Sequence, residues 1–463
     1  MMRLAEAAAA LRGRASGGDT LFTGVSSDSR SINAGDLFVA LRGERFDGHD
    51  FLKAAAAAKA AAAMVDGNYR GEYPLPALVV DDTRRALGDL ARYWRARFVP
   101  ALIAVTGSNG KTTVKEMLAA ILRREAARNA LGEAAVLATR GNLNNDIGLP
   151  LTVLGLRHAH RWCAIELGMN HRGEIGYLAG IARPTVALVN NAQREHLEFM
   201  RSVEEVAAEN ASVYDALPED GVAVINADDA HAPLFRERAG KRRSVEFGLG
   251  GGAVTGRYRL ERLSSEIRLS TPAGEADTTL AIPGLHNVCN ALAAAACAFA
   301  AGIEAKTIAE GLSAFRPYAG RLQVKRSAGG ATVIDDSYNA NPDSVRAAID
   351  VLAACPAPTA LVLGDMGEVG EHGPQFHREV GEYARAKGVS QLLALGEATR
   401  HAVDAFGQGA SHFATVDELL SKIEAKTVLV KGSRFMKMER VVIALTGQAG
   451  SAPASGRSAE GGH

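Results

Sequence analysis

The chain has 463 residues, of which 47% are apolar and 22% charged, and this ordinary globular composition excludes a disordered protein. Lysine plus arginine and aspartate plus glutamate each total 52, so the formal net charge is zero, which argues against a dedicated nucleic-acid-binding protein. Because a domain averages roughly 150 residues, we expect about three domains.

Residues 1–97 are predicted to form a small N-terminal α/β domain. Short apolar runs, DLFVAL and ALVVDD, predict strands. The alanine-rich run FLKAAAAAKAAAAM predicts a helix, because alanine has the highest helix propensity. A second helix, TRRALGDLARYWRARF, leads to Pro100, where we place the domain boundary.

Residues 98–318 alternate between strand and helix patterns. The unbroken apolar strands ALIAVTG, WCAIELG, TVALVNN and VAVINADD predict a parallel sheet that is covered on both faces. The alternating stretch from Arg257 to Gly284 predicts antiparallel strands added to that sheet. We expect this domain to be a doubly wound, P-loop ATPase-like domain.

Residues 319–448 repeat the α/β alternation, with strands ATVIDD, TALVLGD, SQLLALG and KTVLVKGS. This pattern predicts a second doubly wound, Rossmann-like domain. Residues 449–463 are rich in glycine and serine and are predicted to be a disordered tail. The fold class is therefore α/β with three domains.

Cysteine usage and hydropathy bear on the compartment. The four cysteines are scattered without a CxxC pair, which favours a reducing cytoplasm over a zinc or disulfide framework. The N-terminus lacks the apolar stretch of a signal peptide, and the longest weakly polar run, near 291–303, is too short to cross a bilayer. We expect a cytoplasmic protein that binds no membrane.

The strongest local motif is the strand ALIAV followed by TGSNGKTT and an amphipathic helix. A glycine-rich turn at a helix N-terminus points several backbone N–H groups at one anion. Lys111 is placed to reach the β- and γ-phosphates of ATP, and the Thr112 hydroxyl to bind Mg²⁺. Val105 replaces the first glycine of the usual pattern, and the alternative is a tight turn with a solvated lysine.

Two further side chains follow apolar strands at the sheet edge where ligands bind in doubly wound folds. Glu166 ends an apolar strand in AIELGMN, and His196 follows the next strand in NNAQREHLE. A second Mg²⁺ would need oxygen or imidazole ligands there. Each residue taken alone is equally consistent with a polar loop position.

Two segments carry more polar residues than turns require, namely TRGNLNNDIGLPLT and DDSYNANPDS. Asparagine and aspartate clusters usually form Asx turns and helix caps. Because both segments lie at predicted sheet edges, a binding role is favoured.

The order of TGSNGKTT, ELGMNHRGEI, GLHNVCNALAA, the Gly320–Arg321 pair and DDSYNANPDS resembles the ATP-dependent Mur ligases, which build the peptide stem of bacterial peptidoglycan. The segment SSDSRSINAGDLFVALRGERFDGHDF is similar to the UDP-sugar-binding domain of the later members. The resemblance covers nearly the whole chain except the tail. It implies ATP and Mg²⁺ as cofactors.

Within this family, GNLNNDIGLPLT, DDSYNANP and LGDMGEVGE favour the branch that joins D-alanyl-D-alanine to UDP-N-acetylmuramoyl-tripeptide through an acyl phosphate. The DNPR motif of the ligase that adds the third amino acid is absent, and folylpolyglutamate synthetases lack the N-terminal domain. The alternatives are a sister amide ligase, an ATP-binding scaffold without turnover and, more remotely, a nucleic-acid ATPase. We expect a monomer that binds no nucleic acid.

The resemblance also implies roles for individual residues. The catalytic residues it implies are Lys111, Glu166, His196 and Arg321. The metal site it implies comprises Thr112, Glu166 and His196. The nucleotide site it implies comprises Gly107, Ser108, Asn109, Gly110, Lys111, Thr112, Thr113, His286, Asn287, Asn290, Arg321 and Asp336. The substrate contacts it implies are Ser29, Arg30, Asn144, Asn145, Lys431, Ser433 and Arg434, the last three being otherwise a turn and a helix start.

One position departs from the family. Many Mur ligases carry a carbamylated lysine that binds the second magnesium, and Asn210 aligns with it here. No lysine lies between Lys115 and Lys241, so this stretch cannot supply a carbamate. Our hypothesis is that Asn210 orients a metal-bound water or binds the metal through its amide.

Arg321 and Asp336 belong to the third predicted domain, whereas the P-loop belongs to the second. A site divided in this way must be assembled by domain closure, which also excludes water. We therefore expect a hinge at residues 315–320, bracketed by Pro317 and Gly320.

Overall fold

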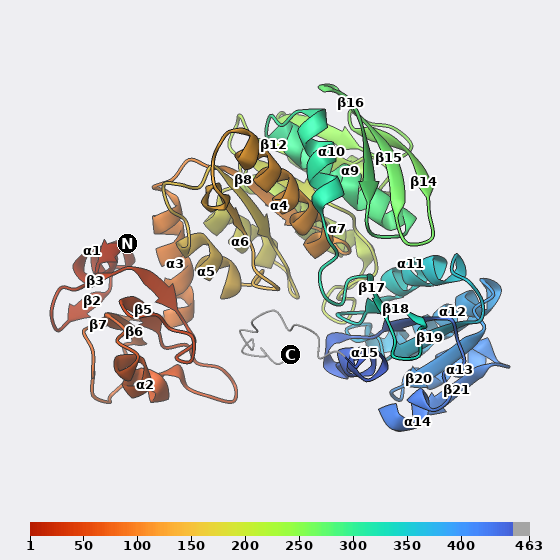
Figure 1. The fold of residues 1–463 in the computed structure, drawn as a ribbon. Helices are drawn as coiled ribbons and strands as arrows, with labels where there is room; N and C mark the ends of the chain where they lie inside the picture. The colour runs from red at the N-terminus through yellow and green to blue at the C-terminus, as the bar shows by residue number, and fades with distance from the viewer. Residues whose placement is uncertain (448–463) are drawn as a thin grey trace.

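The computed structural model describes residues 1–447, which form three α/β blocks arranged as an arc (Figure 1). The N-terminal block lies at one end, the C-terminal block at the other, and the central block joins them. The predicted α/β class is confirmed. The predicted tail at 449–463 lies outside the described residues.

The N-terminal block is built on a five-stranded sheet in the order β2-β7-β6-β5-β4, in which only β2 is antiparallel to its neighbour. A two-stranded pair, β1-β3, lies beside it. Its elements are β1 (Met2–Arg3), α1 (Leu4–Leu11), β2 (Arg14–Ser16), β3 (Leu21–Phe22), β4 (Gly24–Ser26), β5 (Asp36–Val39), the 3-10 turn η1 (Gly48–Phe51), α2 (Leu52–Ala57), β6 (Ala62–Asp66), β7 (Ala77–Val80) and α3 (Thr83–Arg95).

The alanine-rich segment differs from the predicted single helix. Helix α2 ends at Ala57, Lys59 has a left-handed φ of 64°, and β6 begins at Ala62. Every residue of β6 is buried, and the strand lies between β5 and β7. The prediction was wrong here because burial within a sheet outweighs the helix propensity of alanine.

The central block contains a six-stranded parallel sheet in the order β13-β12-β11-β8-β10-β9. Successive residues of β8 (Ala101–Thr106) face opposite layers, as they must in a strand. Leu102 and Ala104 join the apolar cluster that contains Leu90 of α3, whereas Ile103 and Val105 join the one that contains α4 and α9. The predicted coverage of both faces is confirmed.

The other elements of this sheet and its helices follow in chain order. They are α4 (Lys111–Arg128), η2 (Glu133–Ala135), β9 (Val136–Ala138), α5 (Gly148–Leu154), β10 (Trp162–Glu166), α6 (Glu174–Ala182), β11 (Val186–Val189), α7 (Val203–Ala211), η3 (Ser212–Ala216), β12 (Val222–Asn226), α8 (Ala232–Ala239), β13 (Arg243–Phe247), α9 (Leu285–Ala300) and α10 (Ala305–Ala314). The P-loop is the connection from β8 to α4, so its backbone lies at the carboxyl edge of the sheet.

Three antiparallel strands follow β13, namely β14 (Thr255–Leu260), β15 (Ser265–Thr271) and β16 (Gly274–Leu280). Their antiparallel pairing is confirmed, but they form a sheet of their own and do not extend the parallel one. A bridge between Phe247 and Val254 links this region to β13. The separate sheet packs its inner residues, such as Ile267 and Leu269, into the core that α9 shares.

The C-terminal block has a second six-stranded sheet, in the order β17-β18-β22-β19-β20-β21, with β17 antiparallel at the edge. Its elements are β17 (Gln323–Arg326), β18 (Thr332–Asp336), α11 (Pro342–Ala353), β19 (Thr359–Gly364), η4 (Gly370–His372), α12 (Gly373–Ala386), β20 (Gln391–Leu395), α13 (Arg400–Phe406), β21 (Ala410–Phe413), α14 (Val416–Leu420), β22 (Thr427–Lys431), η5 (Arg434–Met436) and α15 (Glu439–Thr446). The predicted second doubly wound fold is confirmed.

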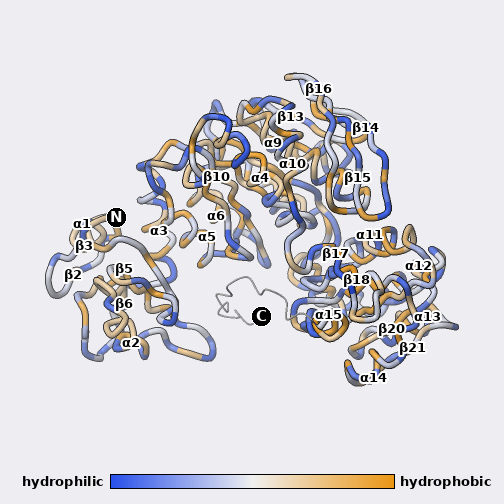
Figure 2. Tube along the Cα trace, viewed as in Figure 1, coloured by the Kyte–Doolittle hydropathy of each residue, from blue (hydrophilic) through white to orange (hydrophobic). Residues whose placement is uncertain are grey.

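Hydrophobic stretches lie within the strands and helices of each block, and hydrophilic stretches lie in many of the connecting loops (Figure 2). Within residues 1–447, no helix combines the length and apolarity that crossing a membrane requires.

Candidate functional site

A cleft of about 2960 Å³ is lined by residues of all three blocks. The predicted residues that line it are Arg30, Ser108, Asn109, Gly110, Lys111, Thr112, Thr113, Asn144, Asn145, Glu166, His196, His286, Asn287, Asn290, Arg321, Asp336, Lys431 and Arg434. Ser29, Gly107 and Ser433 are not part of the lining. The structure thus brings most of the predicted site to one cavity.

The P-loop requires glycine at two positions. Gly107 has a φ of 125° and Gly110 a φ of 83°, conformations that residues with a Cβ rarely adopt. A Cβ on Gly110 would also collide with the side-chain oxygen of Asn290 on α9. The loop is fixed further by Asn109, whose backbone N–H donates to Asn191 Oδ1 at 2.8 Å.

The ammonium group of Lys111 folds back over the P-loop. It donates to the carbonyl oxygens of Gly107 at 2.7 Å and Ser108 at 3.0 Å, and it pairs with Glu195 at 3.0 Å. Burial would raise the pKa of Glu195, but Lys111 and the neighbouring His196 hold it below its usual value. Glu195 therefore keeps a negative charge beside the P-loop lysine.

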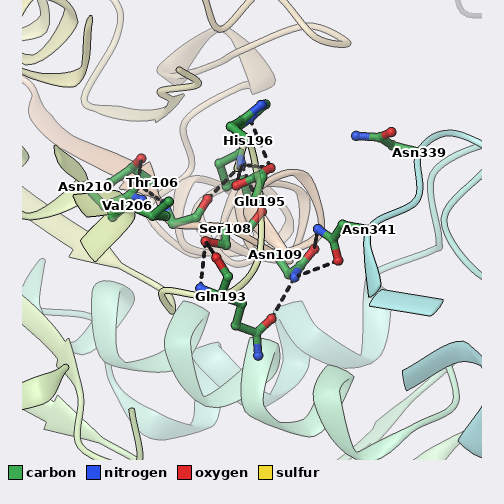
Figure 3. A network of polar contacts seen from close by, with 12 residues as sticks. Thr106, Ser108, Asn109, Gln193, Glu195, His196, Val206, Asn210, Asn339 and Asn341 are labelled. Atoms are coloured by element: carbon green, nitrogen blue, oxygen red, sulfur yellow. Dashed lines mark hydrogen bonds and ion pairs between the residues drawn. The ribbon is translucent and has the colours of Figure 1, made fainter. Parts of the chain in front are cut away.

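His196 lies between two carboxylates. Its Nε2 is 3.5 Å from Glu195, and its Nδ1 is 2.6 Å from Glu368 of the C-terminal block, an ion-pair contact whose geometry is not that of a hydrogen bond. Burial alone would lower the pKa of His196, but the two carboxylates outweigh it and raise the pKa to about 9. Figure 3 shows the ring of His196 above Glu195, with the P-loop residues Ser108 and Asn109 below.

Glu166 is a buried carboxylate at the end of β10. Its Oε1 accepts hydrogen bonds from Asn144 Nδ2 at 2.7 Å and Thr112 Oγ1 at 3.2 Å. Its Oε2 is buried without a hydrogen-bond partner. An unpartnered buried carboxylate oxygen beside a P-loop threonine is suited to a hard cation.

Asn210 differs from its predicted role. Its Oδ1 accepts hydrogen bonds from Thr106 Oγ1 at 2.7 Å and Gly107 N at 2.8 Å, and its Nδ2 donates to Val206 O at 2.9 Å (Figure 3). Both lone pairs of the amide oxygen are therefore used, and the side chain is buried. The hypothesis that the amide oxygen binds the metal was wrong, because this oxygen fixes the entrance of the P-loop. Within residues 1–447, no contact tests the alternative that Asn210 orients a metal-bound water.

The predicted adenine-side residues lie together on α9. Asn290 accepts from Asn190 Nδ2 at 3.0 Å and donates to Asn287 Oδ1 at 3.1 Å, so these amides form one buried chain. His286 lines the cleft beside them, and desolvation lowers its pKa to about 4.

Five predicted residues come from the C-terminal block, namely Arg321, Asp336, Lys431, Ser433 and Arg434. The Arg321 guanidinium lies 4.1 Å from the centre of the Tyr338 ring, and its Nε is buried without a partner. Lys431 is buried and pairs with Asp336 at 2.6 Å, and desolvation lowers its pKa. Ser433 is buried too, accepting from Gly367 N at 2.6 Å.

The remaining predicted substrate residues have local partners. Arg30 is exposed and pairs with Asp28 at 2.6 Å at the N-terminal end of the cleft. Asn145 accepts from Gly148 N at 2.9 Å at the start of α5.

Sequence reasoning missed Glu195, Glu368, Arg194 and Asn341. Arg194 pairs with Asp343 at 2.5 Å and Glu379 at 2.7 Å, and Asn341 donates to Asn109 Oδ1 at 2.9 Å (Figure 3). The sequence signals were that Arg194 and Glu195 directly precede His196, that Asn341 lies in the segment DDSYNANPDS, and that Glu368 lies in LGDMGEVGE. These signals marked segments and did not single out the individual side chains.

Each of the three blocks matches a domain model of one protein family. Residues 21–95 match the family model "Mur ligase family, catalytic domain", residues 105–298 "Mur ligase middle domain", and residues 320–434 "Mur ligase, glutamate ligase domain".

Curated relatives include the UDP-N-acetylmuramoyl-tripeptide–D-alanyl-D-alanine ligases of Escherichia coli and Bacillus subtilis. The first is 40% identical and the alignment covers 94% of this chain and 96% of the relative. The second is 34% identical, with 91% and 93% covered.

Solved structures agree. MurF from Acinetobacter baumannii matches with a TM-score of 0.87 at 33% identity, covering 97% of this chain and 100% of that one. MurF from Thermotoga maritima in complex with ADP matches with a TM-score of 0.77 at 25% identity, covering 91% and 96%. The chain therefore belongs to the Mur ligase family.

Proposed function

We propose that this chain is an ATP-dependent, ADP-forming ligase that joins D-alanyl-D-alanine to UDP-N-acetylmuramoyl-tripeptide. The observation that carries the proposal is one cleft that combines a P-loop with polar residues of both flanking blocks. The names of the relatives supply the substrates, because they align along nearly their whole length with this chain.

The chemistry follows from the reacting groups. A carboxylate is a poor electrophile, since its negative charge repels an amine and its leaving group would be oxide. Transfer of the γ-phosphoryl group of ATP gives an acyl phosphate, which has a good leaving group. The amine of the dipeptide then attacks, and the tetrahedral intermediate collapses to the amide and phosphate.

The charged side chains of the cleft suit this order of chemical steps. Negative charge spreads over the transferred phosphoryl group, so cations fixed around it stabilise the transition state. We assign this role to Lys111 and Arg321. Arg321 has a free buried Nε, and Lys111 can leave Glu195 for a phosphate, which offers the same kind of charge-assisted hydrogen bond.

Mg²⁺ belongs to the proposal as well. Within residues 1–447 no group of three or more His, Cys, Asp or Glu side chains is arranged as a metal cage. Mg²⁺ usually needs only one or two carboxylates, with water and phosphate oxygens completing its shell. Thr112, Glu166 and His196 would hold it, and the ion would neutralise phosphate charge when bound.

The substrates are proposed to lie along the cleft. The uridine diphosphate end would lie near Arg30, with Ser29 in the adjacent turn, and the peptide near Asn144 and Asn145. Arg434 would receive the dipeptide or the acyl carboxylate. Lys431 and Ser433 are both buried, so they would support the binding of that group from below the surface of the cleft.

Nucleotide contacts complete the proposed assignment. Gly107 to Thr113 would hold the phosphates, and His286, Asn287, Asn290 and Asp336 the nucleoside. The divisions at 1–97, 98–318 and 319–448 are proposed as moving units with a hinge at 315–320, and the enzyme as a cytoplasmic monomer. Matching small-angle scattering profiles with and without both substrates would contradict closure.

The test is phosphate release from ATP with UDP-N-acetylmuramoyl-tripeptide, with and without D-alanyl-D-alanine, and detection of the pentapeptide by mass. We expect release to require both substrates. Lys111→Met should lower kcat by about a hundredfold or more, because it removes a cation at the developing charge. Lys306→Met, at an exposed position on α10, is the matched control. Lack of the pentapeptide from wild-type protein that still binds ATP would refute the substrate assignment.

A further inference from the structure

The contact between His196 and Glu368 joins the nucleotide side of the central block to the C-terminal block. His196 follows β11 in the central block, and Glu368 follows β19 in the C-terminal block. The 2.6 Å separation of His196 Nδ1 and Glu368 Oε2 is supported by the backbone, because Glu198 N donates to Glu368 O at 3.3 Å. Side chain and main chain therefore hold the same two loops together.

Both partners adopt an uncommon backbone conformation. His196 has a φ of 54° and Glu368 a φ of 58°, which lie in the left-handed region that favours glycine. Such conformations persist where surrounding contacts enforce them, and they concentrate at functional sites. Gly370 has a φ of 57°, and a Cβ at this position would lie 3.4 Å from the Cα of Glu198. The two loops thus fit each other closely.

The ring of His196 has a carboxylate at each nitrogen. Nδ1 faces Glu368, while Nε2 faces Glu195, which holds Lys111. The Glu368 side chain is 32% exposed, so it is no core residue whose removal would leave a large cavity. The Glu368 side chain therefore contributes more to the position of the His196 ring than to the packing of its own loop.

We propose that Glu368 is a positioning residue that fixes the His196 ring through Nδ1 and directs Nε2 to the metal–phosphate site. The C-terminal block thereby completes a site that the central block carries. This inference rests on the proposed function, because it takes His196 as a ligand of the nucleotide-bound divalent ion. A carboxylate on the second nitrogen of a metal-binding histidine fixes the ring orientation and the tautomer.

The test measures metal binding without turnover. Free Mn²⁺ is titrated into the full chain with saturating ADP and followed by electron paramagnetic resonance. Glu368→Ala should weaken Mn²⁺ binding by about 10- to 100-fold, the usual effect of losing such a partner, and leave ADP binding without metal unchanged. Glu368→Gln keeps an oxygen in the place beside Nδ1 and should restore most of the affinity. Glu371→Ala, exposed in the same loop, is the matched control.

A double variant separates positioning from a structural effect. If Glu368 acts through His196, the change Glu368→Ala should have no further effect on Mn²⁺ affinity in a His196→Ala background. Unchanged Mn²⁺ affinity in Glu368→Ala, a Gln variant as weak as the Ala variant, or additive effects in the double variant would each overturn the inference. The substrate assignment is judged separately by the pentapeptide product: its absence together with weakened Mn²⁺ binding in Glu368→Ala would refute the function and keep the positioning role.

Discussion

The central block shares an apolar cluster with each of its two neighbours, but the polar contacts at the two junctions differ in kind. At the N-terminal junction, Trp94 of α3 is buried, and its Nε1 donates to Leu156 O at 3.1 Å. Arg95 beside it is buried and donates to the carbonyl oxygen of Ala182 at 2.7 Å. At the C-terminal junction, part-exposed Arg194 and buried His196 pair with carboxylates whose side chains are part-exposed.

The difference indicates which junction can open. Buried apolar packing and neutral carbonyl acceptors are lost only at a high cost in free energy, whereas part-exposed ion pairs exchange readily with water and salt. The charged junction also borders the P-loop, so nucleotide binding and block movement share the same residues. We therefore expect the N-terminal junction to hold α3 firmly and the C-terminal junction to move.

Trp94→Ala tests the firm junction and should have the largest effect. Removing a buried tryptophan side chain costs about 3–5 kcal/mol of unfolding free energy. Urea denaturation followed by circular dichroism measures it, and Trp162→Ala, at a part-buried strand position, provides the comparison. A loss below about 1 kcal/mol would mean that α3 is held by something other than this packing.

His286 reports whether the charged junction is closed. Desolvation lowers its pKa to about 4 from the ordinary 6.5, and its charged surroundings, Asp336, Lys431 and Asp350, all belong to the C-terminal block. Between pH 6.5 and 4 the unfolded chain binds a proton that the folded chain does not. The stabilisation is therefore complete above pH 6.5 and is lost as the pH falls towards 4, by up to about 3 kcal/mol.

The measurement compares unfolding free energies of the wild type and His286→Gln from pH 7 to 4.5. The difference between them should shift against the wild type as the pH falls, because only the wild type carries this titrating group. Parallel pH profiles would indicate that His286 is hydrated in solution, and hence that the junction is open without ligand.

The features that sequence reasoning captured are those with a local or periodic signal. The apolar strands and the P-loop follow from patterns within a few residues, and Glu166 and His196 follow from their place after strands. Alanine-rich β6 was missed because its conformation is decided by burial between β5 and β7. The placement of the β14–β16 sheet also depends on tertiary packing, which alternation alone does not reveal.

The site residues that escaped prediction share another cause. Glu368 and Arg194 are charged loop residues, and such residues are usually solvated. Their role depends on which block lies opposite, and no spacing along one chain segment encodes that. Asn210 was located correctly but misinterpreted, because its direction within α7 turns the amide beneath the P-loop.

Asn210→Ala tests the neutral contacts that fix the P-loop from within the central block. Gly107 N and Thr106 Oγ1 would lose their acceptor, which should cost about 1–3 kcal/mol of unfolding free energy and weaken ADP binding. Calorimetric titration with ADP and urea denaturation measure the two effects. Added bicarbonate should leave wild-type activity unchanged at fixed pH and ionic strength, and a severalfold increase would restore the case for a carbamate in the site.

Arg194→Ala should have the smallest effect on stability and the clearest dependence on salt. Its guanidinium pairs with Asp343 and Glu379 while the side chain remains 24% exposed. Part-exposed pairs contribute about 1 kcal/mol or less, and this contribution falls as salt shortens the Debye length. Unfolding free energies at about 0.05 M and 0.5 M salt measure it.

Arg84→Ala is the matched variant at the N-terminal junction, where Arg84 pairs with Asp146 while 56% exposed. Both variants should lose little stability, but only Arg194→Ala should also increase the radius of gyration at low salt, because it removes the ion pairs that tie the central block to Asp343 and Glu379 of the C-terminal block. If Arg84→Ala expanded the protein as much, the two junctions would be equally mobile. In that case the apolar packing of α3 would not hold the N-terminal junction more firmly than the ion pairs hold the C-terminal junction.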